Sequence, residues 1–283
     1  MAKTHKPTKK PTANTLTVMQ LLSSLKHDES ERGVYGIAHA LIKQGHRSII
    51  ISSAHADDEL VVRLMRDGSY HHTLPMPKKS WWALRHVLSL RALIDQHKPD
   101  IIHVHSRTPA WVLYWALRPY PESMRPKVVS TMYGFYPLGK YAQAMFDADI
   151  LITASKSIEK YLKKELSELN DNEPHPYEKR LVCIRRGIDV RKYPYRHHVS
   201  AHWLQQKFIE FPKLEHKLWL LFPTPIGQEY GQEWLIDIIG NLKEKYPNIH
   251  LIIFDDDSDE STDLSPSLAY EDFRQRTATL GLS

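Results

Sequence analysis

The sequence has almost no cysteine, little glycine and no long apolar run. Cys183 is the one cysteine among 283 residues, which excludes an intrachain disulfide framework and a cysteine-rich zinc site. The 11 glycines are about 4% of the chain, where ~7% is usual. No apolar stretch approaches the ~20 residues of a membrane-spanning helix, which argues against an integral membrane protein.

The charge is modest and spread along the chain. With 38 Lys and Arg against 33 Asp and Glu, the net charge is 38 − 33 = +5, and 42% of the residues are hydrophobic, as in ordinary globular proteins. No P-loop or helix-turn-helix signature is present, so nucleic-acid binding is not expected. Residues 1–14 are rich in Lys, Thr and Pro and predict a basic flexible tail. No apolar segment of a secretory signal follows that tail, and we expect a cytoplasmic protein.

Short apolar runs alternate with amphipathic stretches from residue 15 onward. The runs predict strands over 15–22, 47–53, 71–76, 100–106, 126–132, 149–154 and 181–187. The stretches between them predict helices over 34–42, 57–68, 81–97, 109–118, 138–147 and 156–168. This order predicts an α/β fold, a Rossmann-like parallel sheet with helices on both faces. Ligands of such sheets bind beyond the carboxyl ends of the strands.

The pattern restarts after Tyr195. A helix is expected over 199–209, strands over 217–223 and 248–254, and helices over 230–245 and 268–280. We therefore predict an N-terminal domain over 15–195 and a partial, incomplete second Rossmann-like domain over 196–283. So small a sheet is marginal by itself, and its edge is expected to need cover.

The order of several motifs resembles family 4 glycosyltransferases. The motifs are VMQLLSSL, ERGVYGIAHALIKQGHRSIIISS, KPDIIHVHSRTPAW, STMYGFY, ADILITASKSIEKYL and CIRRGIDVRKY. The resemblance is to enzymes of bacterial lipopolysaccharide and capsule biosynthesis, which have the two-domain GT-B fold. It implies an N-terminal domain that contacts a glycolipid or oligosaccharide acceptor and a C-terminal domain that binds a nucleotide-sugar donor. It also implies transfer between them with retention of configuration, no bound metal and no further cofactor.

The resemblance places acceptor-side residues in three segments. The family's first loop carries a glycine pair, where this chain has Asp28 and Glu29, and the loop ends here in Arg32 and Gly33. Two carboxylates repel a diphosphate, and an exposed acidic loop is the alternative interpretation. The acceptor-binding candidates are Arg32, Gly33 and Gly134 from the resemblance, and His105, Ser106 and Arg107 because they end or follow a predicted strand. An interdomain salt bridge is the alternative for Arg107.

Tyr133 stands where the family commonly has a histidine near the reacting sugar. The resemblance makes it the catalytic candidate, although a tyrosine is not a near-neutral acid or base. The alternative is an aromatic cluster of Tyr133, Phe135 and Tyr136 that packs the cleft wall.

The donor side departs from the family. The matching positions are Arg185, Arg186, Gly187, Asp189 and Gly231, with an interdomain structural role as the alternative for the arginine pair. Pro225 and Tyr230 stand where an arginine and a lysine clamp the donor phosphates, and the chain reaches Ser283 before the family's paired glutamates. We expect a degenerate donor site, as in a pseudoenzyme. The alternatives are a non-catalytic acceptor-binding adaptor, or a split subunit that pairs with an active glycosyltransferase or with itself.

A basic, tryptophan-containing segment begins near residue 78. Lys78, Lys79, Trp81, Trp82 and Arg85 combine cations with interfacial aromatics, which suits a helix on the surface of an anionic membrane. Peripheral attachment to the inner membrane is the expectation, and packing of the tryptophans on a neighbouring helix is the alternative.

Overall fold

The computed structural model divides the chain into two compact units, Met1–Ile188 and Asp189–Ser283, called unit 1 and unit 2 below. The residues it describes are 15–23, 25, 29–53, 58–76, 81–137, 139–168, 180–188, 190–191, 194–195, 198–223, 232–253 and 275–278. No helix within these ranges is long and apolar enough to cross a bilayer.

Unit 1 contains a seven-stranded sheet in the order β3-β2-β1-β4-β5-β6-β7. Its strands are β1 (Thr17–Leu21), β2 (Arg47–Ser52), β3 (Tyr70–Thr73), β4 (Ile101–Val104), β5 (Lys127–Met132), β6 (Ile150–Thr153) and β7 (Leu181–Cys183). Every pair of neighbouring strands is parallel. The predicted Rossmann-like α/β fold is thereby confirmed, and the order reverses direction at β1 and β4, where such sheets bind ligands.

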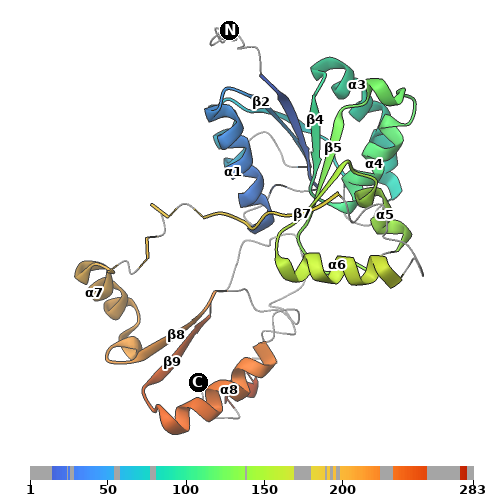
Figure 1. Cartoon of the computed structure of the whole chain (residues 1–283). Helices are drawn as coiled ribbons and strands as arrows, with labels where there is room; N and C mark the ends of the chain where they lie inside the picture. Colours follow the sequence, from blue (N-terminus) through green and yellow to red (C-terminus); the bar gives the residue numbers. More distant parts are fainter. Residues whose placement is uncertain are drawn as a thin grey trace. The chain divides into compact units, whose positions relative to one another are not determined.

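Helices cover both faces of this sheet (Figure 1). On one face lie α1 (Glu29–Lys43) and α2 (Glu59–Arg66), whose apolar side chains pack with Leu22 and Ile50. On the other lie α3 (Val87–His97), α4 (Arg107–Leu117), α5 (Lys140–Phe146) and α6 (Lys156–Glu168). Short 3-10 turns η1 (Trp81–His86) and η2 (Glu122–Met124) complete the connections.

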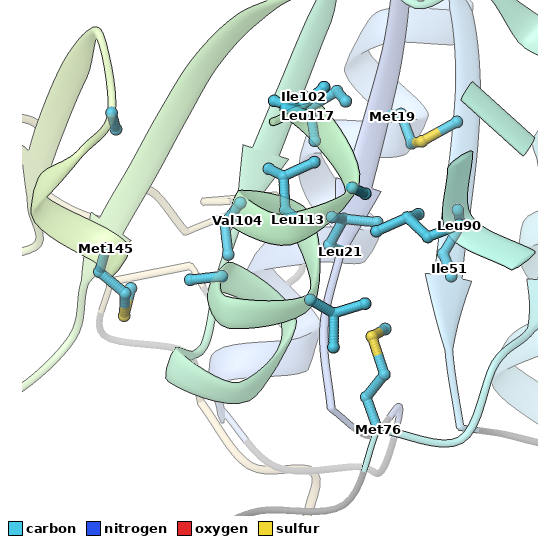
Figure 2. Close-up of a cluster of buried hydrophobic side chains, with 14 of the residues drawn as sticks. Met19, Leu21, Ile51, Met76, Leu90, Ile102, Val104, Leu113, Leu117 and Met145 are labelled. Atoms are coloured by element: carbon cyan, nitrogen blue, oxygen red, sulfur yellow. The ribbon is translucent and has the colours of Figure 1, made fainter. Parts of the chain in front are cut away.

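The main core lies between the central strands and α4. Met19 and Leu21 of β1 meet Leu113 of α4, with Leu90 of α3 beside them (Figure 2). Side chains of β1 alternate between the two faces of the sheet. Gln20, between Met19 and Leu21, therefore faces the α1 side together with Ile50, its partner on β2. Both faces of the central strands are buried, which explains their nearly continuous apolar sequence.

Two expectations about helix boundaries were wrong. The helix predicted over 81–97 is divided into η1 and α3, and His86, at the junction, has φ −86° and ψ 2°. Tryptophan is a weaker helix former than leucine or alanine, and 3-10 turns are common at helix starts. The first loop, expected to end in Arg32 and Gly33, is also shorter, because α1 begins at Glu29 and includes both residues. Acidic residues are favourable in a first helical turn.

Unit 2 contains one strand–helix–strand unit with parallel strands. β8 (Leu218–Phe222) pairs with β9 (Ile249–Ile253), and α8 (Gln232–Lys245) connects them. α7 (Ala201–Glu210) precedes them, and its N-cap Ser200 accepts a hydrogen bond from the Trp203 amide. The turn η4 (Pro212–Leu214) follows α7. Of the helix predicted over 268–280, residues 275–278 are described and are helical.

Candidate functional site

The candidate site lies at the carboxyl edge of the unit 1 sheet. His105 follows β4, Tyr133 follows β5 and Arg186 follows β7, so the parallel strands bring these three residues to one edge. Val104 pairs with Ser130 in the sheet, which places His105 level with Thr131, two residues before Tyr133. The edge is therefore assembled by strand register from segments distant in sequence.

His105 links two neighbouring strands through both of its ring nitrogens. Its Nε2 lies 3.1 Å from Gln20 Oε1, and its Nδ1 lies 2.7 Å from the Tyr133 hydroxyl. Complete burial, with His103 and Arg186 nearby, holds the pKa of His105 well below 6.5, so the ring is neutral. The amide oxygen of Gln20 only accepts, so Nε2 carries the hydrogen, and Nδ1 accepts from the Tyr133 hydroxyl. His105 thus orients Tyr133 and reaches a ligand only through it.

A second buried imidazole supports the first. The rings of His103 and His105 lie 4.0 Å apart between centroids. His103 Nε2 is 2.7 Å from Thr131 Oγ1, and burial lowers the pKa of His103 to about 4. His103 therefore lies within β4 with its Nε2 hydrogen-bonded inside the fold.

Tyr133 anchors a guanidinium group. The Arg186 guanidinium lies 4.5 Å from the centroid of the Tyr133 ring and hydrogen-bonds its hydroxyl. Burial raises the pKa of Tyr133, while Arg186 lowers it in part, so the phenol stays protonated at neutral pH. A Cβ on Gly33 would lie 4.0 Å from Arg186 Nε, which places the arginine beside the first turns of α1. The catalytic role of Tyr133 stays a prediction, because the structure shows a hydroxyl already held by His105 and Arg186.

Arg107, the first residue of α4, lies between two tyrosine rings. Its guanidinium is 5.0 Å from the Tyr136 centroid and 4.9 Å from the Tyr141 centroid. Tyr141 is fixed in turn, because its hydroxyl lies 2.6 Å from Thr108 Oγ1 and its carbonyl accepts from Trp111 Nε1 at 3.0 Å. Within the described ranges, no carboxylate forms an ion pair with Arg107.

Ser106 and Gly134 contribute to the edge through contacts within the fold. The Ser106 hydroxyl accepts from the Ser23 amide at 3.2 Å and lies 2.9 Å from Ser23 Oγ. Ser106 therefore fastens the loop after β4 to the loop after β1, and its hydroxyl is used within the fold. A Cβ on Gly134 would lie 3.9 Å from the Tyr136 ring, so that ring packs over the Gly134 backbone.

The structure brings together seven of the residues selected from sequence. They are Gly33, His105, Ser106, Arg107, Tyr133, Gly134 and Arg186. Arg185 and Gly187 are exposed. Of Arg32 and Trp81 only the backbone is described. Lys78, Lys79, Asp189, Pro225, Tyr230 and Gly231 lie outside the described residues.

Sequence reasoning missed Gln20 and Tyr141. Gln20 is fully buried, and its Nε2 has no hydrogen-bond partner in the described part of the chain. A lone polar residue within the apolar run VMQLL was the available signal. No signal pointed to Tyr141, whose importance comes from the packing of α5 beside α4.

The site lies within a region that matches a known family. The profile of Glycosyltransferase Family 4 matches residues 30–192, more than half of the chain. No curated protein matches the sequence.

Solved structures share the fold at low identity. A glycosyltransferase from Rickettsia africae ESF-5 has a TM-score of 0.72 and 21% identity, over 95% of this chain and 66% of its own. Anabaena Alr3699/HepE in complex with UDP and glucose has a TM-score of 0.67 and 14% identity, over 95% and 67%. The lipopolysaccharide outer core galactosyltransferase WaaB, in its apo form, has a TM-score of 0.60 and 12% identity, over 94% and 65%. These likenesses confirm the predicted GT-B-like fold, and the chain spans about two thirds of the length of each structure.

Proposed function

The chain belongs to glycosyltransferase family 4, and on that basis we propose that it serves sugar transfer from a nucleotide-sugar to a glycolipid or oligosaccharide acceptor of the bacterial cell envelope. The observation that carries the proposal is the ordered group of His105, Tyr133, Arg107 and Arg186 at the carboxyl edge of unit 1. This edge is where parallel sheets bind ligands. Unit 1 is proposed to bind the acceptor.

Cations at this edge suit an acceptor that carries an anionic group. Guanidinium groups held in advance by aromatic rings meet such a group with little reorganisation. The neutral histidines below them add no competing charge, because burial lowers the pKa of both His103 and His105.

We propose that the donor side is weakened. Pro225 and Tyr230 stand where the family's arginine and lysine hold the donor phosphates. Each lost charge-assisted contact is worth about 1.5–3 kcal/mol. The chain is therefore proposed to bind nucleotide-sugars weakly and to depend on its acceptor side for affinity.

A second candidate follows from the same two substitutions. A protein that keeps an acceptor site and lacks donor contacts can act as a non-catalytic adaptor, or as one subunit beside an active glycosyltransferase. The two candidates differ in one observable property, since only the first forms a glycosylated product.

Calorimetry with uridine, guanosine and cytidine nucleotide-sugars tests the donor side. We expect dissociation constants of about 1 mM or weaker for each. The matched variant Pro225→Arg with Tyr230→Lys restores both cations and is expected to bind at least one donor about a hundredfold more tightly. Micromolar binding by the unaltered chain contradicts a weakened donor site.

Mass spectrometry of acceptors incubated with concentrated donor separates the two candidates. A product with added sugar mass supports transfer. Acceptor binding without product, in both the unaltered chain and the cation-restored variant, supports the adaptor.

The η1–α3 surface is proposed to contact the inner membrane. Trp82 is 61% exposed and Leu88 is 69% exposed. Arg85 lies between them and is exposed, with its Nε directed to His86 at 3.1 Å. Exposed apolar groups beside cations suit the interface of an anionic bilayer, where a glycolipid acceptor resides.

A further inference from the structure

Two guanidinium groups lie over tyrosine rings at the carboxyl edge of unit 1. Arg107, at the start of α4, lies 5.0 Å from the Tyr136 centroid, and Arg186, in the segment after β7, lies 4.5 Å from the Tyr133 centroid. The positive charge of each also lowers the pKa of Tyr136, which burial raises. An anion that contacts both cations would reduce the repulsion between them.

The contacts of Arg107 leave its hydrogen-bond donors available. The rings of Tyr136 and Tyr141 lie 5.0 and 4.9 Å from its guanidinium carbon, measured to the ring centroids. A guanidinium beside aromatic rings still has five N–H groups to donate. Within the described residues no hydrogen-bond acceptor is found for Arg107, so its N–H groups can donate to a ligand.

The other cation is held at a fixed place by the network below it. Gln20 orients His105, His105 orients the Tyr133 hydroxyl, and Tyr133 holds Arg186 through its ring and hydroxyl. A surface arginine normally loses considerable side-chain entropy when it binds a ligand. Here much of that loss has already occurred in the folded protein.

An exposed aromatic ring lies in the same loop as Tyr133 and Tyr136. Phe135, between Tyr133 and Tyr136 in sequence, is 62% exposed and meets Tyr161 edge-on at 5.2 Å between centroids. An exposed ring on an otherwise polar edge offers an apolar face to a ligand. A sugar ring presents C–H groups to such a face and hydroxyls to its surroundings.

We infer that the carboxyl edge of unit 1 binds a sugar that carries a phosphate group, with Arg107 and Arg186 on the phosphate and Phe135 on the ring. A phosphate monoester near neutral pH carries almost two negative charges and matches two guanidinium groups in charge and hydrogen-bond geometry. The inference rests on the proposed function and specifies it: the acceptor is a phosphorylated glycan.

Calorimetry with glucose 6-phosphate, inorganic phosphate, glucose and UDP tests the inference. We expect glucose 6-phosphate to bind more tightly than either inorganic phosphate or glucose. Arg107→Gln and Arg186→Gln are each expected to weaken its binding about tenfold. Arg107→Lys keeps the charge and loses the planar fork, so an intermediate loss is expected.

Two further variants keep the test specific. Arg118→Gln removes an equal charge that is also stacked, at 5.0 Å over Trp115, but at the opposite end of α4. It is expected to bind glucose 6-phosphate like the unaltered chain. Phe135→Ala is expected to retain inorganic phosphate and to lose the preference for glucose 6-phosphate over it. Thermal unfolding of each variant identifies any that fails to fold.

The inference is overturned if glucose 6-phosphate binds no better than glucose, or equally well to Arg107→Gln and Arg118→Gln. It is also overturned if UDP binds more tightly than glucose 6-phosphate and depends on the same arginines, because the edge then takes the donor diphosphate. Transfer to an uncharged glycan without glucose 6-phosphate binding removes this inference and leaves the proposed function standing. If glucose 6-phosphate binds but no acceptor receives a sugar, this inference stands and the proposed sugar transfer is contradicted.

Discussion

The two edges of the unit 1 sheet use charge in opposite ways. At the amino edge, carboxylates bind the strands together: Asp100 Oδ2 accepts from the Thr17 amide at 2.7 Å, and Asp149 accepts from the Val128 amide at 2.8 Å and pairs with Lys127 at 2.9 Å. At the carboxyl edge, Arg107 and Arg186 lie on tyrosine rings.

This contrast separates charge that joins neighbouring strands from charge that lies on aromatic rings. The acids at the amino edge find their hydrogen-bond donors within neighbouring strands, so the fold itself satisfies them. At the carboxyl edge Arg107 lies on the rings of Tyr136 and Tyr141, and Arg186 lies on the ring of Tyr133. Four changes to the protein or its solution, in order of decreasing expected effect, test this contrast.

Acidification should weaken the carboxyl edge first. Folded His103 has a pKa of about 4, whereas an unfolded histidine titrates near 6.5. The unfolded chain therefore takes up the proton first, and stability is complete above pH 6.5 and lost as pH falls toward 4. The loss for His103 is about 3 kcal/mol, measured by urea denaturation across this range.

His103→Gln is the matched variant for this titration. Glutamine can still hydrogen-bond Thr131 but does not titrate. The free energy of unfolding should therefore fall less steeply between pH 6.5 and 4 in this variant. The amino edge responds at lower pH, because the pKa of Asp149 is lowered from 3.8 and its contribution is lost as pH falls below that value. If the free energy of unfolding depends on pH equally in His103→Gln and the unaltered chain, His103 is not the group that titrates in this range.

Substitution of the acids should cost more stability than substitution of the arginines. Asp100→Ala removes the acceptor of the Thr17 amide and is expected to lower the free energy of unfolding by about 2 kcal/mol. Arg107→Gln loses only its ring contacts, about 1 kcal/mol or less. Asp147→Ala, at an exposed position after α5, serves as control. Equal losses for Asp100→Ala and Arg107→Gln contradict the comparison.

Tyr133→Phe isolates the hydroxyl that connects His105 and Arg186. The ring remains beneath Arg186, but its hydroxyl anchor is gone, so affinity for glucose 6-phosphate should fall about tenfold. Tyr120, just beyond the far end of α4, has a comparable hydroxyl that donates to Asp95 of α3. Tyr120→Phe removes this hydroxyl and should leave the affinity for glucose 6-phosphate unchanged. If both variants bind alike in calorimetry, Tyr133 does not position Arg186.

Arg85→Gln should give the smallest effect. One arginine near an anionic bilayer contributes about 1 kcal/mol, so co-sedimentation with phosphatidylglycerol vesicles should weaken about fivefold. Arg63→Gln, on α2 at the other face of the sheet, is the control. Identical sedimentation of the two variants argues against lipid contact at the η1–α3 surface.

Much of the fold followed from sequence, because buried parallel strands and amphipathic helices have clear apolar patterns. Tyr133 and Arg186 were also selected, from the family resemblance, as were His105 and Arg107, which lie at or just after the end of a predicted strand. Their partnership was not predictable, because it depends on the register of β4 against β5 and on the packing of α5 beside α4. Ser106 shows the converse: its position indicated a ligand contact, yet its hydroxyl bonds Ser23.

The central claim is that the carboxyl edge of unit 1 recognises an anionic glycan through its two arginines. The most direct measurement is binding of the unaltered chain, the double variant Arg107→Gln with Arg186→Gln, and Arg118→Gln to an array of lipooligosaccharide-derived glycans with and without phosphate. We predict that the unaltered chain and Arg118→Gln retain phosphorylated glycans, and that the double variant, folded by circular dichroism, loses about a hundredfold in affinity. Equal binding by all three proteins, or binding indifferent to phosphate, would contradict the account.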